Sequence, residues 1–147
     1  MMLKGIPHFM DADLLWVLAA MGHGDELAVV DRNFSAHRVA RDTTSGKLIV
    51  LNGMNATDAI EGILKLFPLD SFVDRPVSHM EAADQPGKLL DVHADVEMIC
   101  SKAAARKLVS HPIERFAYYP IAKACFAVIQ TNEDRPYANF ILKKGVV

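Results

Sequence analysis

Residues 21–31 place an imidazole and a carboxylate on the two sides of a short apolar run. His23 has a glycine on each side, and Asp31 directly follows the run 27–30. Glycines next to a histidine remove side-chain bulk and allow positive φ, so a small ligand could approach the ring and the neighbouring amides. Because an unperturbed histidine titrates near pH 6.5, the chemistry that this residue type could do near neutrality is proton transfer.

Both residues also have purely structural interpretations. A histidine between glycines often only ends a helix, where its ring is favourable near the negative end of the helix dipole. An aspartate after a strand is often a turn residue. Against this, ligands of open α/β sheets bind at the carboxyl ends of the strands, where Asp31 is expected. The residues alone leave the two interpretations open.

The elements that must position these residues alternate between helix and strand. Hydrophobic periodicity predicts helices over 13–21, from a cap near Thr57 to Phe67, from a cap at Asp91 or Asp95 to Lys107, and over 113–124, where Pro120 either ends one helix or lies in the first turn of the next. Short apolar runs predict strands over 27–30, 47–51, 77–80, 126–130 and 139–142, and the polar segment 32–46 is predicted to be a long loop. This alternation predicts an α/β fold, a three-layer sandwich with a mostly parallel central sheet flanked by helices, formed by residues 1–147 as a single domain.

Composition narrows the possible partners. The 147 residues carry 16 Lys and Arg against 18 Asp and Glu, and 51% are hydrophobic, which argues against a nucleic acid or an anionic membrane as partner. No apolar run approaches the roughly 18 residues needed to cross a bilayer, and no secretion signal is apparent, so we expect a cytoplasmic location. Cys100 and Cys125 are expected to be buried thiols, and no spacing of cysteines or histidines indicates a metal site.

Four blocks of the chain together resemble the ribose pyranase and L-fucose mutarotase family. They are residues 21–26, Asp31, residues 115–119 and residues 137–145, and their order and spacing fit over nearly the whole chain. The arginine at position 115, followed by Phe and Ala, is similar to the fucose branch rather than to the ribose pyranases. One residue departs from that branch, because Ala138 stands where its members commonly have glycine. Alanine takes positive φ less readily than glycine, so either the backbone is extended there or the pocket is slightly reshaped.

The resemblance implies a cofactor-free enzyme that interconverts the anomers of a free monosaccharide, with L-fucose or a related sugar as the expected substrate. It implies that His23 is the active residue and that the sugar-binding groups are Asp31, Arg115, Tyr137, Ala138 and Asn139. It further implies a homo-oligomer, commonly a ring-shaped decamer, with sites near the subunit boundaries. In such a ring we expect the C-terminal block of one subunit to complete a pocket that His23 of a neighbour begins.

The residue types suit that reaction. Changing an anomer takes a proton off the anomeric hydroxyl and puts a proton on the ring oxygen, and a well-placed acid or base contributes about 10² to 10⁴ in rate. We expect His23 to give the proton to the ring oxygen, with a tyrosine hydroxyl or water as the second group. Asp31 would accept hydrogen bonds from two sugar hydroxyls and would keep His23 protonated if the two lie close. Arg115 offers a fork of donors, Asn139 a donor and an acceptor, and Tyr137 a flat apolar face.

Several of these side chains have alternative roles. Arg115 could be an exposed helix residue paired with Glu114 or Glu133. Tyr119 fits the site and the core equally well, whereas its neighbour at position 118 is expected in the core or an interface. A second candidate histidine, His37, could line the pocket mouth or lie exposed on its loop. The histidines at positions 8, 79, 93 and 111 are expected to be structural.

Two other functions stay open. The first is a D-ribose pyranase, which would do the same chemistry in a different pocket. The second is a non-catalytic sugar-binding accessory of an uptake pathway, in which Asp31, Arg115 and Asn139 would bind the sugar and His23 would only donate or accept a hydrogen bond. Replacing His23 separates the two classes, because only an enzyme has an exchange reaction to lose.

Overall fold

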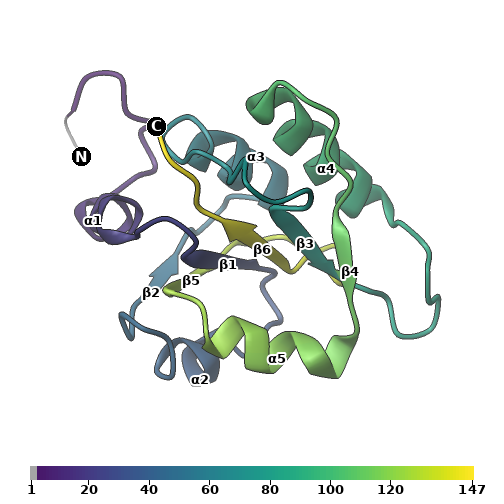
Figure 1. The fold of residues 1–147 in the computed structure, drawn as a ribbon. Coiled ribbons are helices and arrows are strands. Elements are labelled where there is room, and N and C mark those ends of the chain that lie inside the picture. The colour runs from purple at the N-terminus through teal and green to yellow at the C-terminus, as the bar shows by residue number, and fades with distance from the viewer. Residues whose placement is uncertain (1–2) are drawn as a thin grey trace.

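The computed structural model describes residues 3–147. The helices of this described part are α1 (Ala12–Ala20), α2 (Ala36–Ala40), α3 (Ala56–Ile63), α4 (Asp91–Ala104) and α5 (Arg115–Lys123). The strands are β1 (Glu26–Val30), β2 (Leu48–Val50), β3 (Val77–Met80), β4 (His111–Ile113), β5 (Ala127–Gln130) and β6 (Phe140–Lys143). They form one sheet in the order β2-β5-β1-β6-β3-β4 (Figure 1). Over residues 3–147 no helix is both long enough and apolar enough to cross a membrane.

The sheet is mostly parallel, as predicted. β1 pairs with β5, and β5 with β2, in parallel, and β3 pairs with β4 in the same way. Only β6 runs in the opposite direction, between β1 and β3, with Leu142 opposite Leu27 on one side and Val77 on the other. Parallel neighbours need crossover connections, and the helices that make them cover the faces of the sheet.

Each face of the sheet has its own hydrophobic core. α1, α3 and α4 cover one face, and α2 and α5 cover the other (Figure 1). Along β1, Leu27 and Val29 join the first core, whereas Ala28 and Val30 join the second. All four side chains are fully buried, so this central strand is apolar on both of its faces. The predicted three-layer α/β sandwich is confirmed.

Two short elements were not expected from the sequence. The predicted loop 32–46 contains α2, which has five residues and no side-chain hydrogen bond at its N-cap, Ser35. A helix of this length is too short to show a 3.6-residue period. The predicted helix over 113–124 begins only at Arg115, because His111–Ile113 form the edge strand β4. Pro112 is tolerated there because an edge strand leaves one row of N–H groups unpaired.

Helix boundaries differ as well. The N-cap of α3 is Asn55 rather than Thr57, and the N-cap of α4 is Leu90 rather than an aspartate. Both helices end earlier than their apolar patterns suggested, at Ile63 and Ala104. Pro120 neither ends a helix nor begins one: it lies inside α5 on the exposed side, where the carbonyl group that loses its N–H partner can bond water instead.

Candidate functional site

A small polar cavity lies at the carboxyl end of β1. Asp31 directly follows β1, and Asn139 directly precedes the antiparallel β6, so the sheet brings both to the same edge. Arg115 and Tyr119 come from α5, and Tyr137 comes from the loop before β6. These five residues line one cavity of about 260 Å³. The structure therefore brings together five of the site residues that were predicted from the sequence.

Asp31 and Asn139 are bonded to each other. The backbone N–H of Asp31 donates to Oδ1 of Asn139 (2.9 Å), and the Asp31 carboxylate accepts the backbone N–H of Asn33 (3.0 Å). Asp31 is 7% exposed. Burial raises the pKa of its carboxyl group, against the lowering effect of these hydrogen bonds. Asn139 thus positions Asp31 in addition to facing the cavity.

The backbone at position 138 does not need the positive φ that a glycine would allow. Tyr137, not Ala138, occupies the left-handed region, with a φ of 60°. The Tyr137 carbonyl accepts a hydrogen bond from Nε2 of the buried His93 (2.8 Å), and Nδ1 of His93 accepts the backbone N–H of Leu90 (3.3 Å). The side chain of Ala138 is fully buried in the core beneath α1, α3 and α4. Contrary to expectation, Ala138 does not line the cavity, and its side chain adds no sugar-binding group.

The carboxylates considered as partners of Arg115 bind elsewhere. Glu114 is the N-cap of α5 and accepts the backbone N–H groups that follow it. Glu133 pairs with Arg135 (2.9 Å), which lowers the pKa of the glutamate despite the opposing effect of its burial. Within residues 3–147 Arg115 forms no ion pair, and its exposed side chain is available at the cavity. The alternative role of Arg115 as one half of an exposed pair is wrong.

Of the remaining aromatic and histidine candidates, one lies at the cavity, one in the core and one on the surface. Tyr119 is half-buried at the cavity, and its ring stacks on Phe34 with 5.2 Å between centroids and 10° between planes. Tyr118 belongs to the core, where its hydroxyl donates to the carbonyl of Phe140 (2.9 Å). His37 lies exposed on α2 and does not line the cavity.

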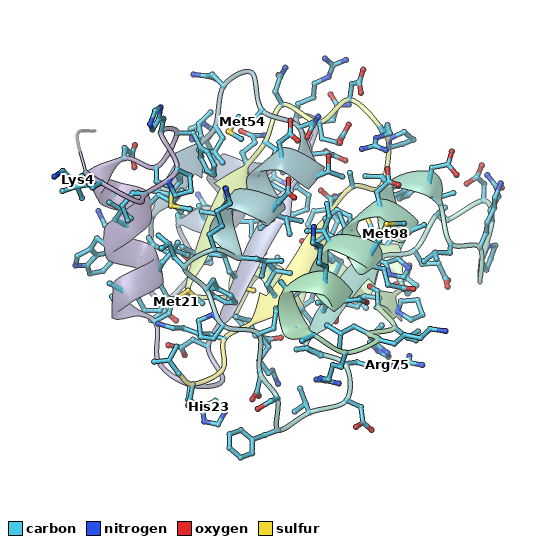
Figure 2. All side chains as sticks on the ribbon, turned by 90° about the horizontal axis from the view of Figure 1, so that it is seen from above. Lys4, Met21, His23, Met54, Arg75 and Met98 are labelled. Carbon is cyan, nitrogen blue, oxygen red and sulfur yellow. The ribbon has the colours of Figure 1, made fainter. Side chains whose placement is uncertain are left out.

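His23 lies at the opposite end of β1 from this cavity. It belongs to the turn between α1 and β1, whereas Asp31 follows the last residue of the strand. A strand rises about 3.3 Å per residue, so β1 alone separates them by roughly 16 Å. In Figure 2 the His23 ring projects outward from the edge of the molecule. Within one chain, the expectation that Asp31 lies close enough to keep His23 protonated is wrong.

A carboxylate that the sequence did not indicate lies beside His23. Oδ1 of Asp70 is 3.1 Å from Nε2 of His23, and the two side chains are 4% and 46% exposed, respectively. The same oxygen accepts the backbone N–H of Phe72 (3.1 Å), and the Phe72 ring lies 5.1 Å from the imidazole. The pKa of Asp70 is lowered, chiefly by the Phe72 hydrogen bond and further by His23. Asp70 stands 47 residues from His23, so no local spacing pointed to it.

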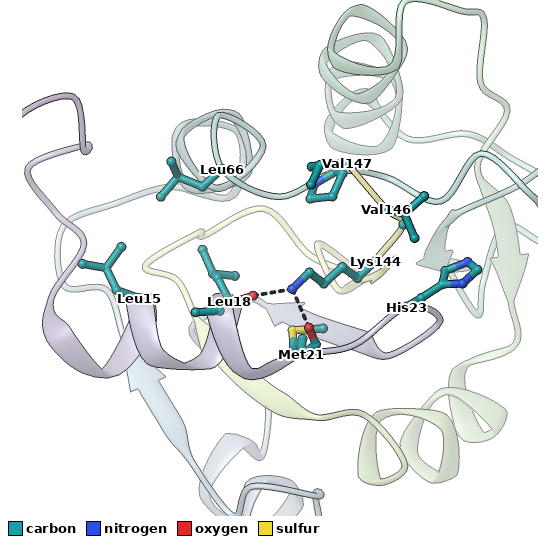
Figure 3. A pocket seen from close by; sticks show the side chains of 11 residues that line it. Leu15, Leu18, Met21, His23, Leu66, Lys144, Val146 and Val147 are labelled. Atoms are coloured by element: carbon teal, nitrogen blue, oxygen red, sulfur yellow. Dashed lines mark hydrogen bonds between the residues drawn. The ribbon is translucent and has the colours of Figure 1, made fainter.

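His23 also borders a second, mainly apolar cavity of about 650 Å³ between α1, the end of α3 and the C-terminal residues (Figure 3). The Lys144 ammonium donates to the carbonyl groups of Leu18 (2.7 Å) and Met21 at the end of α1. The last carbonyls of a helix have no partner within the helix, so Lys144 caps α1. The chain segment after β6 thereby fixes the helix end that leads into His23.

Known proteins resemble this chain over almost its full length. A model of the RbsD / FucU transport protein family matches residues 4–147. The L-fucose mutarotase of Actinobacillus pleuropneumoniae is 41% identical, with 99% of this chain and 97% of the relative covered, and the fucose mutarotase of Homo sapiens is 38% identical, with 99% and 94% covered. The crystal structure of the fucose mutarotase of Streptococcus pneumoniae in complex with L-fucose is 32% identical, covers 99% of both chains and has a TM-score of 0.86. With the family model, the sequences and the fold in agreement, the chain belongs to the RbsD / FucU transport protein family.

Proposed function

We propose that this protein is a cofactor-free mutarotase that interconverts the α and β anomers of a free monosaccharide, with L-fucose or a related sugar as its substrate. The observation that carries this function is the cavity at the carboxyl end of β1, where Asp31, Arg115, Tyr137 and Asn139 gather. Relatives named fucose mutarotase match nearly the whole chain at 38% and 41% identity, which supports the choice of sugar. Residues 1–147 would form a single mutarotase-like domain.

The cavity offers the groups that a small sugar needs. The Asp31 carboxylate would accept hydrogen bonds from two neighbouring hydroxyls, and Arg115 would donate to others. The rings of Tyr119 and Tyr137 would pack on the apolar face of the sugar, with their hydroxyls toward solvent or substrate. A neutral substrate suits this site, because the buried Asp31 would repel an anionic one.

The active site would be shared between subunits. His23 and the polar cavity lie at opposite ends of β1, so one chain alone does not place the imidazole at the sugar. A head-to-tail interface would bring His23 of one subunit to the cavity of the next, and repetition of that contact closes a ring, for which we propose a decamer. Two exposed aromatic rings fit this arrangement: Phe72 beside His23 and Phe116 beside Arg115, each 72% exposed in the single chain.

The reaction would consist of two proton transfers. His23 would donate a proton to the ring oxygen while the anomeric hydroxyl loses its proton to a tyrosine hydroxyl or a water molecule. The bond between the ring oxygen and the anomeric carbon breaks, and the open-chain aldehyde forms. After rotation of the aldehyde, the same steps in reverse close the ring on its other face. No electrons leave the sugar, so the reaction needs no redox partner.

The test is NMR saturation transfer between the α and β anomer signals of L-fucose, with catalytic amounts of protein and with D-ribose in parallel. We expect exchange well above the protein-free rate for L-fucose. His23→Ala should lose at least about 100-fold of this exchange while keeping measurable sugar affinity. His8→Ala, which removes an exposed histidine that lines neither cavity, is the matched control and should exchange as the wild type does.

Other outcomes identify the rival functions. Exchange that is selective for D-ribose would replace L-fucose by ribose as the substrate and make the protein a D-ribose pyranase. Sugar binding without any exchange would refute the enzyme and favour a sugar-binding accessory of an uptake pathway. The family description as transport proteins is the observation that keeps this second candidate.

A further inference from the structure

We propose that His93 is a positioning residue for Tyr137: it holds the Tyr137 carbonyl group inside the core and thereby keeps the tyrosine ring at the polar cavity, where it packs on the sugar. This inference rests on the mutarotase function proposed above. His93 lies in the first turn of α4, is fully buried and does not line the cavity. It can therefore act on the sugar only through the backbone of another residue.

The backbone of Tyr137 needs such support. Its φ of 60° lies in the left-handed region, which residues with bulky side chains rarely adopt. A conformation of this kind persists where the surrounding structure fixes it, and it is found most often at ligand sites. The Tyr137 carbonyl lies 2.8 Å from Nε2 of His93, and within residues 3–147 it accepts no other hydrogen bond. The contact with His93 is thus the one that fixes this peptide group.

The direction of this hydrogen bond follows from the other nitrogen of the ring. The backbone N–H of Leu90 points at Nδ1 of His93 (3.3 Å). A backbone N–H can only donate, so Nδ1 must carry a lone pair, and the neutral ring then has its proton on Nε2. Burial lowers the pKa of His93, which agrees with a neutral ring at neutral pH. Nε2–H therefore donates to the Tyr137 carbonyl.

The imidazole of His93 is held in place without help from Tyr137. The ring of His79 lies 4.1 Å from it, and the ring of Phe140 lies 5.9 Å away at an angle of 83°. His79 is itself bonded to the hydroxyl of Ser110 (2.7 Å). The donor is therefore fixed in position before the tyrosine carbonyl meets it.

The chain on each side of Tyr137 has its own anchors. Before it, the backbone N–H of Arg135 donates to the carboxylate of Glu133 (3.2 Å). After it, Oδ1 of Asn139 accepts the backbone N–H of Asp31 (2.9 Å). Loss of the bond from the buried histidine would therefore free the peptide group after Tyr137 without releasing the rest of the segment.

The expected consequence is a loss of sugar affinity with little effect on the chemical step. Without the bond, Tyr137 would spend more time in the ordinary regions of backbone conformation, with its ring away from the cavity. Sugar affinity falls by the fraction of time that the binding conformation is lost. Once sugar is bound, the ring is back in place and His23, the proposed proton donor, is unchanged.

The test compares variants by titration with L-fucose and by anomer exchange. His93→Leu, which has no polar side-chain atom, should raise Kd and KM roughly 10- to 100-fold and leave kcat little changed. His93→Gln keeps a donor and should restore most of the affinity. Val96→Ala is the matched control, since it removes core packing from the same face of α4. It should be less stable but bind L-fucose as the wild type does.

A double variant shows whether His93 acts through Tyr137. Tyr137→Gly removes the ring and takes positive φ freely, so adding His93→Leu to it should weaken L-fucose binding no further. If the losses from the two changes add up instead, the proposed role of His93 is wrong. A folded His93→Leu protein with wild-type affinity would also overturn it.

NMR spectroscopy of the full chain gives a readout that needs no binding. Long-range ¹H–¹⁵N correlation spectra of the wild type at neutral pH should show the Nε2–H tautomer of His93, and a proton on Nδ1 would overturn the inference. In His93→Leu, the backbone chemical shifts of Tyr137 should move away from left-handed values. A wild type that neither binds nor exchanges L-fucose refutes the proposed function instead, and these spectra still decide whether His93 holds Tyr137.

Discussion

At the scale of single residues, the buried polar side chains are the ones that shape the site. Within residues 3–147 every buried side-chain nitrogen and oxygen has a hydrogen-bond partner. His93 bonds the carbonyl of Tyr137, and the ring of His79 lies 4.1 Å from that of His93 and bonds the hydroxyl of Ser110 (2.7 Å). These two histidines, expected to be structural, therefore support the backbone at the polar cavity from inside the core.

The histidine pair predicts how stability depends on pH. Burial, together with the nearby His93 and His111, lowers the pKa of His79 to about 4. An unfolded histidine titrates near 6.5, so between these values the unfolded chain binds a proton that the folded chain does not, and the free energy of unfolding falls as the pH falls. From pH 7 to pH 5 we expect a loss of about 2 kcal/mol from His79 alone, measured by urea unfolding.

The control for this pH dependence is His79→Gln. We expect this variant to be less stable at pH 7, and its free energy of unfolding should change less between pH 7 and pH 5 than that of the wild type. His93 contributes in the same direction, since burial lowers its pKa too, so some slope should persist in the variant. A wild-type stability that stays flat down to pH 5 would show that the pair is protonated inside the fold.

At the scale of elements, the N-cap of α3 shows a limit of prediction from local sequence. The start of α3 was predicted near Thr57, yet Asn55 is the N-cap, and its side chain accepts the backbone N–H of Asp58 (2.8 Å). Thr57 instead donates its hydroxyl to Asn55 (2.9 Å). Both residue types favour caps, so their order along the chain did not decide between them.

Asn55→Ala should lower the free energy of unfolding by about 1 kcal/mol, because the first turn of α3 loses the side chain that satisfies one of its N–H groups. Thr57→Ala is the matched control and should cost clearly less, since Asn55 still caps the helix. Urea unfolding of the two variants beside the wild type is the measurement. Equal losses in both would place the cap at the threonine after all.

The sequence predicted the long elements well because their signals are local. β1 contains a continuous apolar run, and the apolar faces of α1 and α3 repeat with the helix period. α2 and β4 were missed because five and three residues are too few to display a period. β4 also contains Pro112, which only an edge position tolerates, and a position at the edge of a sheet is a property of the folded molecule.

Two residues of the polar cavity could be predicted because they stand next to strands, whereas Asp70 could not be predicted because it lies in an irregular loop. Asp31 and Asn139 stand next to strands, so the direction of β1 and β6 alone brings them to one edge of the sheet. Asp70 lies in a loop without regular structure, 47 residues from the histidine that it meets. Only the docking of that loop against the segment after β6 places it there.

At the scale of the whole molecule, the sheet separates the two halves of the proposed site. The polar cavity is at one end of β1 and His23 is at the other, and both ends carry an exposed phenylalanine. In the proposed arrangement these opposite ends of neighbouring subunits would meet head-to-tail, and repeated contacts of this kind form a ring where the rotation closes.

A mixing experiment tests this arrangement. His23→Ala subunits keep the polar cavity, and Arg115→Ala subunits keep the histidine, so each variant alone should have little anomer exchange. When the two are unfolded together and refolded in equal amounts, about one quarter of the sites should combine two intact halves and recover exchange. Each variant refolded alone is the control. If mixing restores no exchange, the site lies within one subunit and the shared arrangement is wrong.

The two cysteines allow the opening of each face of the sheet to be measured separately. Cys100 is buried in the core beneath α1, α3 and α4, and Cys125 is buried in the core on the other face of the sheet. Burial raises the pKa of Cys100 to about 12 and that of Cys125 still further, so neither thiol reacts while its layer stays closed. The chain contains two cysteines, so each modified thiol can be assigned. The labelling rate of each thiol reports how often its own core opens. Comparison of the two rates therefore shows whether one side of the sheet opens more readily than the other.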